Sequence, residues 1–194
     1  MRVFLGITGA SGAPYAARLL SALSGAGCEV GVSVSAAGYE VLATELHGDA
    51  SLPHDEVRDR LVAGLDGVTV YAGNDYGAPY ASGSAKVDGY VVCPCSMATL
   101  GTIAAGAMDN LVHRAASVAL KEGRRLVLMP RETPLSAIHL EGMLKLRQAG
   151  AVILFLAPGF YHEPKTIDDL VDFVVARALD QLGLDQTLVR RWGQ

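Results

Sequence analysis

Charged side chains are scarce in this sequence, and no long run of one charge is present. They make up 19% of the 194 residues, below the usual share of about a quarter. A low charged fraction together with a surplus of apolar residues excludes an intrinsically disordered chain. The formal net charge is −4, and the lack of a basic run argues against nucleic acid as the main partner.

Cysteine and long hydrophobic runs are scarce as well. The three cysteines, Cys28, Cys93 and Cys95, are too few for a disulfide scaffold, and their spacing resembles no zinc site. We therefore expect no metal centre and a reduced, cytoplasmic location. The longest apolar run, residues 149–161, is interrupted by Pro158 and is too short to span a bilayer, so no membrane association is expected.

Apolar side chains, in contrast, make up 51% of the residues and occur in short runs that alternate with helical patterns. The runs typical of strands cover 3–8, 29–34, 68–71, 90–93, 126–129 and 151–156. The helical patterns cover 13–25, 37–46, 97–105, 110–121, 135–148 and 167–182, whereas 48–66 is irregular and 72–88 is typical of a loop. Continuous apolar strands that alternate with helices predict a parallel sheet buried on both faces.

We therefore expect one flavodoxin-like or Rossmann-like, doubly wound α/β domain over residues 1–194. Its last helix is predicted over 167–182, with Thr166 and Asp169 as a capping pair and a short tail over 184–194. In open parallel sheets, ligands bind beyond the carboxyl ends of the strands. The loops that follow the predicted strands are therefore the places where functional residues are expected.

The loop after the first strand is rich in glycine. It has the spacing G-x-x-G-x-x-G over residues 6–12, and the helix that follows offers N–H groups to an anion. A tight turn capped by Ser11 is an equally good interpretation of these residues alone. A dinucleotide site would need G-x-G-x-x-G and an acidic residue after the second strand, where this chain has Ser35, so NAD is disfavoured. A mononucleotide such as FMN fits, with Ser35 in contact with it.

Three later loops carry polar side chains in the same layer. Ser96 and Thr99 follow the fourth strand, and Ser96 is predicted to cap the next helix. Arg131 and Glu132 follow the fifth strand, and Thr133-Pro134 is predicted to start the helix after them. An arginine held there can bind a phosphate with two N–H groups, and Lys121 can add a point charge.

Two residues nearer the C-terminus complete the candidates. Tyr161 and Arg177 could hold a second phosphate, although a packed tyrosine and a surface arginine are the simpler interpretation of these residues alone. Cys93 and Cys95 end a buried strand and are assigned no chemistry.

Five segments of the chain carry a resemblance to a known family: GITGASGAPYAARLL, CPCSMATL, DNLVHRAA, PRETP followed by IHLEGM, and PGFYH. Together they resemble the flavin prenyltransferases of the UbiX family, over most of the chain and least over 48–80. The resemblance implies a transferase that joins the allyl group of dimethylallyl phosphate to N5 and C6 of reduced FMN without a metal. The product, prenylated FMN, would serve decarboxylases of the UbiD type.

The resemblance also implies roles for individual residues. The positions that match FMN contacts are Gly9, Ala10, Ser11, Ser35, Ser96, Met97, Ala98, Thr99 and Arg131. The positions that match the surroundings of the allyl phosphate are Lys121, Arg131, Glu132, Tyr161 and Arg177. Glu45 matches the acid/base residue, and Ser11 would help to relay the proton; Lys121 and Glu132 complete the catalytic set.

The family further implies a dodecamer built from trimers, with active sites shared between subunits. Two alternatives use the same architecture. One is a flavin-dependent decarboxylase of the cysteine-decarboxylase type, which relies on a histidine motif that this chain does not match. The other is an FMN carrier without catalysis, which would not need Lys121, Arg131 or Tyr161.

Overall fold

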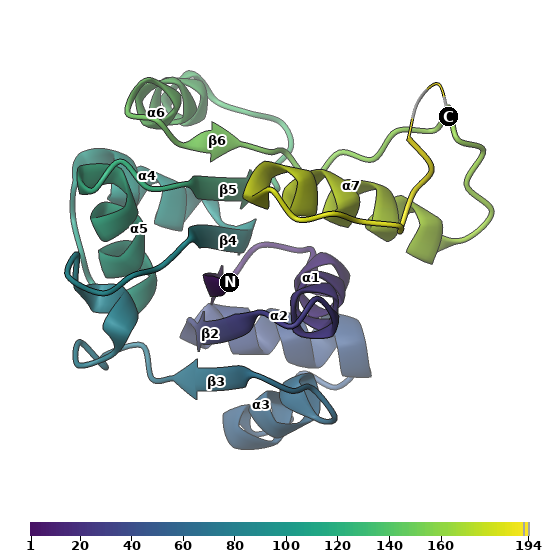
Figure 1. Cartoon of the computed structure of the whole chain (residues 1–194), viewed down its shortest axis with the longest axis horizontal. Coiled ribbons are helices and arrows are strands. Elements are labelled where there is room, and N and C mark those ends of the chain that lie inside the picture. Colours follow the sequence, from purple (N-terminus) through teal and green to yellow (C-terminus); the bar gives the residue numbers. More distant parts are fainter. Residues whose placement is uncertain (192, 194) are drawn as a thin grey trace.

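The computed structural model describes residues 1–191 and 193 and contains one six-stranded sheet. Its strands are β1 (Arg2–Ile7), β2 (Glu29–Val34), β3 (Val68–Tyr71), β4 (Gly89–Cys95), β5 (Leu126–Pro130) and β6 (Val152–Ile153). All neighbouring strands pair in parallel, in the order β3-β2-β1-β4-β5-β6 (Figure 1). The doubly wound parallel sheet predicted from the sequence is confirmed, and its strand order is that of Rossmann folds.

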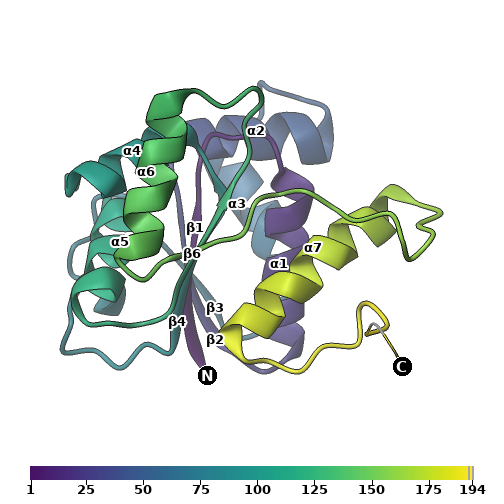
Figure 2. The same cartoon turned by 90° about the horizontal axis from the view of Figure 1, so that it is seen from above.

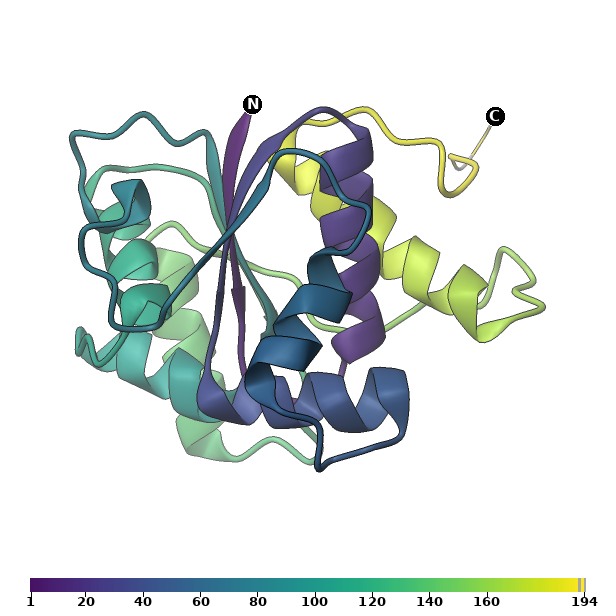
Figure 3. The same cartoon turned by 90° about the horizontal axis from the view of Figure 1, so that it is seen from below.

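Helices cover both faces of this sheet. They are α1 (Ala13–Gly25), α2 (Ala36–His47), α3 (His54–Val62), α4 (Met97–Ala105), α5 (Leu111–Lys121), α6 (Ala137–Gln148) and α7 (Ile167–Leu182), with a short 3-10 helix η1 (Pro79–Ala81). Helices α1, α3 and α7 lie on one face and α4, α5 and α6 on the other (Figures 2 and 3). Within residues 1–191, no helix is long and apolar enough to cross a membrane.

The two faces of the strands supply two separate hydrophobic clusters. Val3, Leu5 and Ile7 of β1 pack toward α1 and α7, whereas Phe4 packs against Tyr80 and Tyr90 on the other face. This alternation along a strand that is buried throughout is typical of a sheet covered by helices on both sides. It explains why the strands are continuous apolar runs in the sequence.

The order of the strands fixes where a ligand can bind. From β1 the chain moves outward through β2 to β3, then crosses back to β4 and moves outward in the other direction. The loops that leave β1 and β4 therefore diverge at the point where the winding reverses. Ligands of open α/β sheets bind at this point, so the loops at residues 8–12 and 94–99 mark the candidate site.

Several predicted boundaries differ from the structure. The irregular stretch 48–66 contains α3, a polar helix in which only Val57 is buried, so it lacked an apolar stripe. The sixth strand is Val152–Ile153 rather than 151–156. Thr133 is not a helix cap, because α6 starts at Ala137 behind a capping box of Ser136 and His139. The predicted tail at 184–194 is described except for positions 192 and 194, which lie outside the described residues.

Candidate active site

The loops after β1 and β4 are joined by one buried threonine. The Thr8 hydroxyl donates to the Pro94 carbonyl (2.8 Å) and accepts from the Ser96 N–H (2.8 Å), while the Thr8 N–H also donates to Pro94 (3.1 Å). Thr8 is only 1% exposed. Buried hydrogen bonds of this kind fix loop geometry, because a change would leave polar groups unpaired. The two halves of the candidate site therefore form one rigid unit.

Glycine is required at two points of the first loop. A Cβ on Gly9 would lie 2.5 Å from the Cβ of Ala37 in α2, too close for any side chain. Gly12 has φ of 133°, a backbone conformation that other residues rarely adopt. The loop therefore lies directly against α2 and exposes backbone at its outer surface, where Gly9 and Ser11 are accessible.

The carboxylate of Glu45 occupies the N-terminus of α1. Its Oε2 atom accepts from the N–H groups of Gly12 (2.9 Å) and Ala13 (2.8 Å), although Glu45 lies 33 residues away on α2. Figure 3 shows α2 lying across the carboxyl edge of the sheet, close to the start of α1. Ser11 is therefore not the cap of α1. The cap residue is Gly12, and no side chain of the cap residue bonds to the helix. The N–H groups expected to be free for an anion are already taken by a carboxylate.

The N-terminus of α4 has free N–H groups instead. Ser96 caps this helix, as predicted, by accepting from the Thr99 N–H (3.2 Å), and its hydroxyl also donates to the Thr99 hydroxyl (3.1 Å). The N–H groups of Met97 and Ala98 in the first turn make no hydrogen bond within the described residues. Free first-turn N–H groups favour an anion. Nearby, Ser35 caps α2 by accepting from Gly38 (3.0 Å).

Arg131 and Glu132 lie at the same edge, directly after β5. The Nε atom of Arg131 is buried and has no hydrogen-bond partner among the described residues. Such an unpaired buried donor is costly unless a ligand satisfies it. Glu132 accepts from the Thr133 N–H through Oε1 (2.9 Å). Together with the first turn of α4, Arg131 makes this edge suited to an anionic ligand.

Tyr161 and Arg177 line one cleft, away from the glycine-rich loop. This cleft has a volume of about 350 Å³ and is bounded by the loop after β6, by α7 and by the tail. Tyr161 packs edge-on against Phe173, with ring centroids 5.6 Å apart, and Arg177 donates to Asp180 (2.7 Å). The structure thus places the predicted pair together, in a cleft that also contains Arg190 and Arg191.

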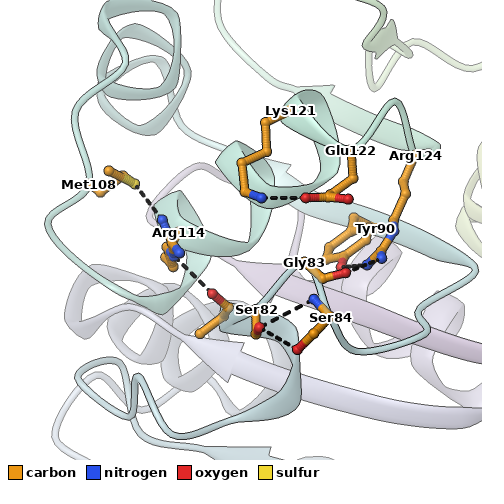
Figure 4. A network of polar contacts seen from close by, with 10 residues as sticks. Ser82, Gly83, Ser84, Tyr90, Met108, Arg114, Lys121, Glu122 and Arg124 are labelled. Carbon is orange, nitrogen blue, oxygen red and sulfur yellow. Dashed lines mark hydrogen bonds and ion pairs between the residues drawn. The ribbon is translucent and has the colours of Figure 1, made fainter.

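Lys121 lies away from both of these regions. Helix α5 starts at the carboxyl edge, where the Leu111 N–H donates to Gly73 (2.6 Å), and it runs back to the amino edge. There Lys121 pairs with Glu122 and lies beside Gly83, in the segment before β4 (Figure 4). An 11-residue helix is about 16 Å long, so Lys121 cannot share a ligand with Arg131 of the same chain.

Comparison with known proteins shows the family of the chain. A family model described as Flavoprotein matches residues 1–179. A flavin prenyltransferase UbiX from Pseudomonas aeruginosa is 50% identical over 199 aligned residues, which cover 100% of this chain and 94% of the relative. The chain belongs to the UbiX family of flavin prenyltransferases.

Solved structures of the UbiX family have the same fold. AnUbiX (PadA1), crystallised with FMN and dimethylallyl pyrophosphate, superposes with a TM-score of 0.89 at 40% identity, covering 100% of this chain and 97% of that one. A dodecameric FMN-dependent Ubix-like decarboxylase from Escherichia coli O157:H7 superposes with a TM-score of 0.89 at 44% identity over both full chains. The cysteine decarboxylase TvaF, at 18% identity and a TM-score of 0.63, covering 94% of this chain and 98% of that one, shares the fold alone.

Two site residues of this UbiX-family chain were missed from the sequence, and two cysteines behave as expected. Thr8 was missed because its partner Pro94 lies 86 residues away. Asp180 was missed because its contact with Arg191 of the tail depends on tertiary structure, although its other partner, Arg177, lies three residues away on α7. Burial raises the pKa of the Cys95 thiol to about 12 and that of Cys93 further, so both are unreactive thiols at neutral pH. Within residues 1–191 and 193, no three His, Cys, Asp or Glu side chains lie together as a metal site.

Proposed function

We propose that this chain transfers the dimethylallyl group of dimethylallyl phosphate to N5 and C6 of reduced FMN, which yields prenylated FMN. The observation that carries the proposal is the pairing of two anion-binding regions. One is the edge formed by the first turn of α4 and Arg131, and the other is the cleft of Tyr161 and Arg177. An FMN carrier would have no need of the cleft, and a decarboxylase of the TvaF type shares only the fold.

FMN would be held at the edge where the winding of the sheet reverses. The residues that fit it are Gly9, Ala10, Ser11, Ser35, Ser96, Met97, Ala98, Thr99 and Arg131. The unpaired Nε of Arg131 and the free N–H groups of α4 supply donors for its phosphate and ring oxygens. Reduced FMN supplies the two nucleophilic atoms of the reaction.

The allylic phosphate would be held by cations, because negative charge develops on its oxygens as the bond to carbon breaks. Tyr161 and Arg177 supply contacts from the cleft, and Arg131 and Glu132 lie at the edge of the sheet. Lys121 would come from a neighbouring copy, since its own chain holds it at the opposite edge. The active site is therefore shared between subunits of the proposed dodecamer of trimers.

Glu45 would accept the proton that leaves when the new ring closes at C6. Its Oε2 is anchored by two N–H groups, while its Oε1 makes no hydrogen bond within the described residues. A carboxylate held by one oxygen leaves the other available as a general base. Ser11, exposed on the adjacent loop, would relay the proton.

The product would act as the cofactor of a UbiD-type decarboxylase in the cytoplasm, which gives a functional test. The chain is incubated anaerobically with reduced FMN and dimethylallyl phosphate, and the protein is then removed by ultrafiltration. The filtrate should restore activity to a UbiD-type decarboxylase that was produced without its cofactor. A filtrate that restores no more activity than FMN alone contradicts the proposal.

A further inference from the structure

Asp180 lies at the centre of the charged groups in the Tyr161–Arg177 cleft. Its Oδ2 accepts from Nη1 of Arg177 (2.7 Å), and its Oδ1 accepts from Nη2 of Arg191 (3.0 Å). The Asp180 side chain is 14% exposed, whereas those of Arg177 and Arg191 are 54% and 45% exposed. One largely enclosed carboxylate thus holds two more exposed cations, one on each wall of the cleft.

The second wall of the cleft is the C-terminal tail. Gly183 ends α7 with φ of 77°, and the chain then turns back beside the helix (Figures 1 and 2). The tail has internal order, because Gln186 and Val189 exchange two hydrogen bonds (3.2 and 3.5 Å). Leu188 packs against the main hydrophobic cluster. The Asp180–Arg191 pair ties this ordered tail to α7 at the cleft.

We infer that Asp180 is a positioning residue for the allylic phosphate. It orients Arg177 toward the cleft and holds the tail as the second wall of the cleft. The inference deepens the proposed function and rests on it. An exposed arginine loses side-chain entropy when it is fixed. Asp180 fixes Arg177 before the substrate arrives. Among the described residues this bond takes only one of the five N–H donors of Arg177, so the others are available for phosphate oxygens.

The cleft stays positively charged although it contains the Asp180 carboxylate. Asp180 neutralises one of the three arginines Arg177, Arg190 and Arg191, so the cleft retains a net positive charge for a phosphate monoester. A carboxylate that served only as a counter-charge would weaken phosphate binding by repulsion. A positioning carboxylate strengthens it. The two roles therefore predict opposite effects when the charge of Asp180 is removed.

The test compares Asp180→Asn with Asp172→Asn. Asp172 lies on the same helix, also pairs with an arginine (Arg18, 2.5 Å), and does not line the cleft. Binding of dimethylallyl phosphate to the protein loaded with oxidised FMN is measured by calorimetry, which needs no turnover. Asp180→Asn should weaken this binding about tenfold, as expected for a lost charge-assisted bond. It should leave FMN affinity unchanged, and Asp172→Asn should leave both affinities unchanged.

A double-mutant cycle shows whether Asp180 acts through Arg177. In the Arg177→Ala background, Asp180→Asn should weaken the binding of dimethylallyl phosphate by less than about twofold more, because the arginine that Asp180 positions is gone. Arg191→Gln, a change at an exposed tail residue, should weaken binding severalfold and serves if Asp180→Asn fails to fold. Unchanged or tighter binding by Asp180→Asn, or full additivity in the cycle, would overturn the inference. If the wild-type protein binds dimethylallyl phosphate but transfers no five-carbon group to FMN, the proposed function is contradicted. The role of Asp180 in binding the phosphate would then still hold.

Discussion

At the scale of single residues, Glu45 connects two parts of the site that are distant in the sequence. Its carboxylate accepts from two N–H groups at the start of α1 and so joins α2 to the glycine-rich loop. A negative group at a helix N-terminus is stabilising, since it satisfies donors that have no partner within the helix. The same contact holds Glu45 beside the glycine-rich loop.

Glu45→Gln should keep FMN bound but slow the completion of the reaction. The amide oxygen of glutamine can accept from Gly12 and Ala13, so the loop keeps its shape, but the amide cannot take up a proton at neutral pH. We expect the rate of formation of the final product to fall by about 10²–10⁴-fold, measured in single-turnover experiments with flavin spectroscopy. Glu40→Gln, an exposed residue on the same helix, is the control. A native rate for Glu45→Gln would leave Glu45 as a helix cap only.

Arg177→Ala and Tyr161→Phe should weaken the use of dimethylallyl phosphate and spare FMN. Both residues line the cleft beside α7 and lie apart from the loops that fit FMN. Loss of a charge-assisted phosphate contact should raise the KM for dimethylallyl phosphate about ten- to a hundredfold for Arg177→Ala, and less for Tyr161→Phe. Arg58→Ala, which removes an exposed arginine paired with Asp59, is the control. An equal loss of FMN affinity in both variants would show that the two regions form one site.

At the scale of elements, α7 carries the residues that form one wall of the Tyr161–Arg177 cleft. It starts with a capping box, in which the Thr166 hydroxyl accepts from the Asp169 N–H (3.1 Å) and Asp169 accepts from the Thr166 N–H (2.9 Å). Its opposite face packs Val171, Val174 and Ala178 into the core. The helix therefore holds Arg177 and Asp180 on a rigid element rather than on a loop.

Thr166→Ala should lower the free energy of unfolding by about 1 kcal/mol, the usual cost of removing a threonine N-cap. Urea denaturation at equal protein concentration measures it, because oligomerisation shifts apparent stability. Thr44→Ala is the matched control, since the Thr44 hydroxyl only donates back to Glu40 within α2 (2.8 Å). An equal effect of the two substitutions would show that the box does not stabilise α7.

The capping box also predicts a dependence on acid. Hydrogen bonds from the N–H groups of Lys165 and Thr166 hold the pKa of Asp169 below its ordinary value. Its contribution to stability is therefore complete above the unfolded pKa of about 3.9 and is lost as the pH falls through the lower folded value. The difference in unfolding free energy between wild type and Asp169→Asn should shrink below pH 4. A difference that stays constant down to pH 2 would contradict this.

The elements that the sequence predicts well are those with a strong apolar pattern. The limits of α7 and of β2 agree with the predicted ranges, since continuous or periodic apolar residues mark them. Helix α3 was missed because it is short and polar, with Val57 as its one fully buried residue. The contacts of Glu45 with the start of α1 and of Asp180 with Arg191 depend on tertiary structure, and no local pattern indicates them. The Arg177–Asp180 pair, in contrast, is an i,i+3 pair on one helix. The catalytic role of Glu45 came only from the resemblance to the UbiX family.

At the scale of the whole molecule, one chain does not bring all of the proposed site residues together. Lys121 lies at the amino edge of the sheet and Arg131 at the carboxyl edge. Ile138 and Leu144 of α6 are 79% and 58% exposed, which is unusual for large apolar side chains and typical of surfaces that contact other subunits. Both observations support the proposed oligomer with shared sites.

Mixed oligomers should therefore recover activity from two inactive chains. Lys121→Ala and Arg131→Ala are each expected to abolish most prenyl transfer. Each site needs Lys121 from one chain and Arg131 from a neighbouring chain. When the two variants are co-expressed in equal amounts and assemble at random, about a quarter of the sites should contain both native residues. Prenylated FMN formation by the mixture is compared with that of each variant alone. No recovery in a mixture of confirmed mixed oligomers would place Lys121 outside the site.

The most direct test of the account is the mass of the flavin after the reaction. The protein is incubated anaerobically with reduced FMN and dimethylallyl phosphate, the flavin is extracted, and its mass is measured. We expect a flavin that has gained one five-carbon unit, in wild type and in the Asp172→Asn control, and far less of it in Arg177→Ala. Bound FMN that is recovered unchanged from wild type, while dimethylallyl phosphate is shown to bind, would contradict the proposal that this chain is a prenyltransferase.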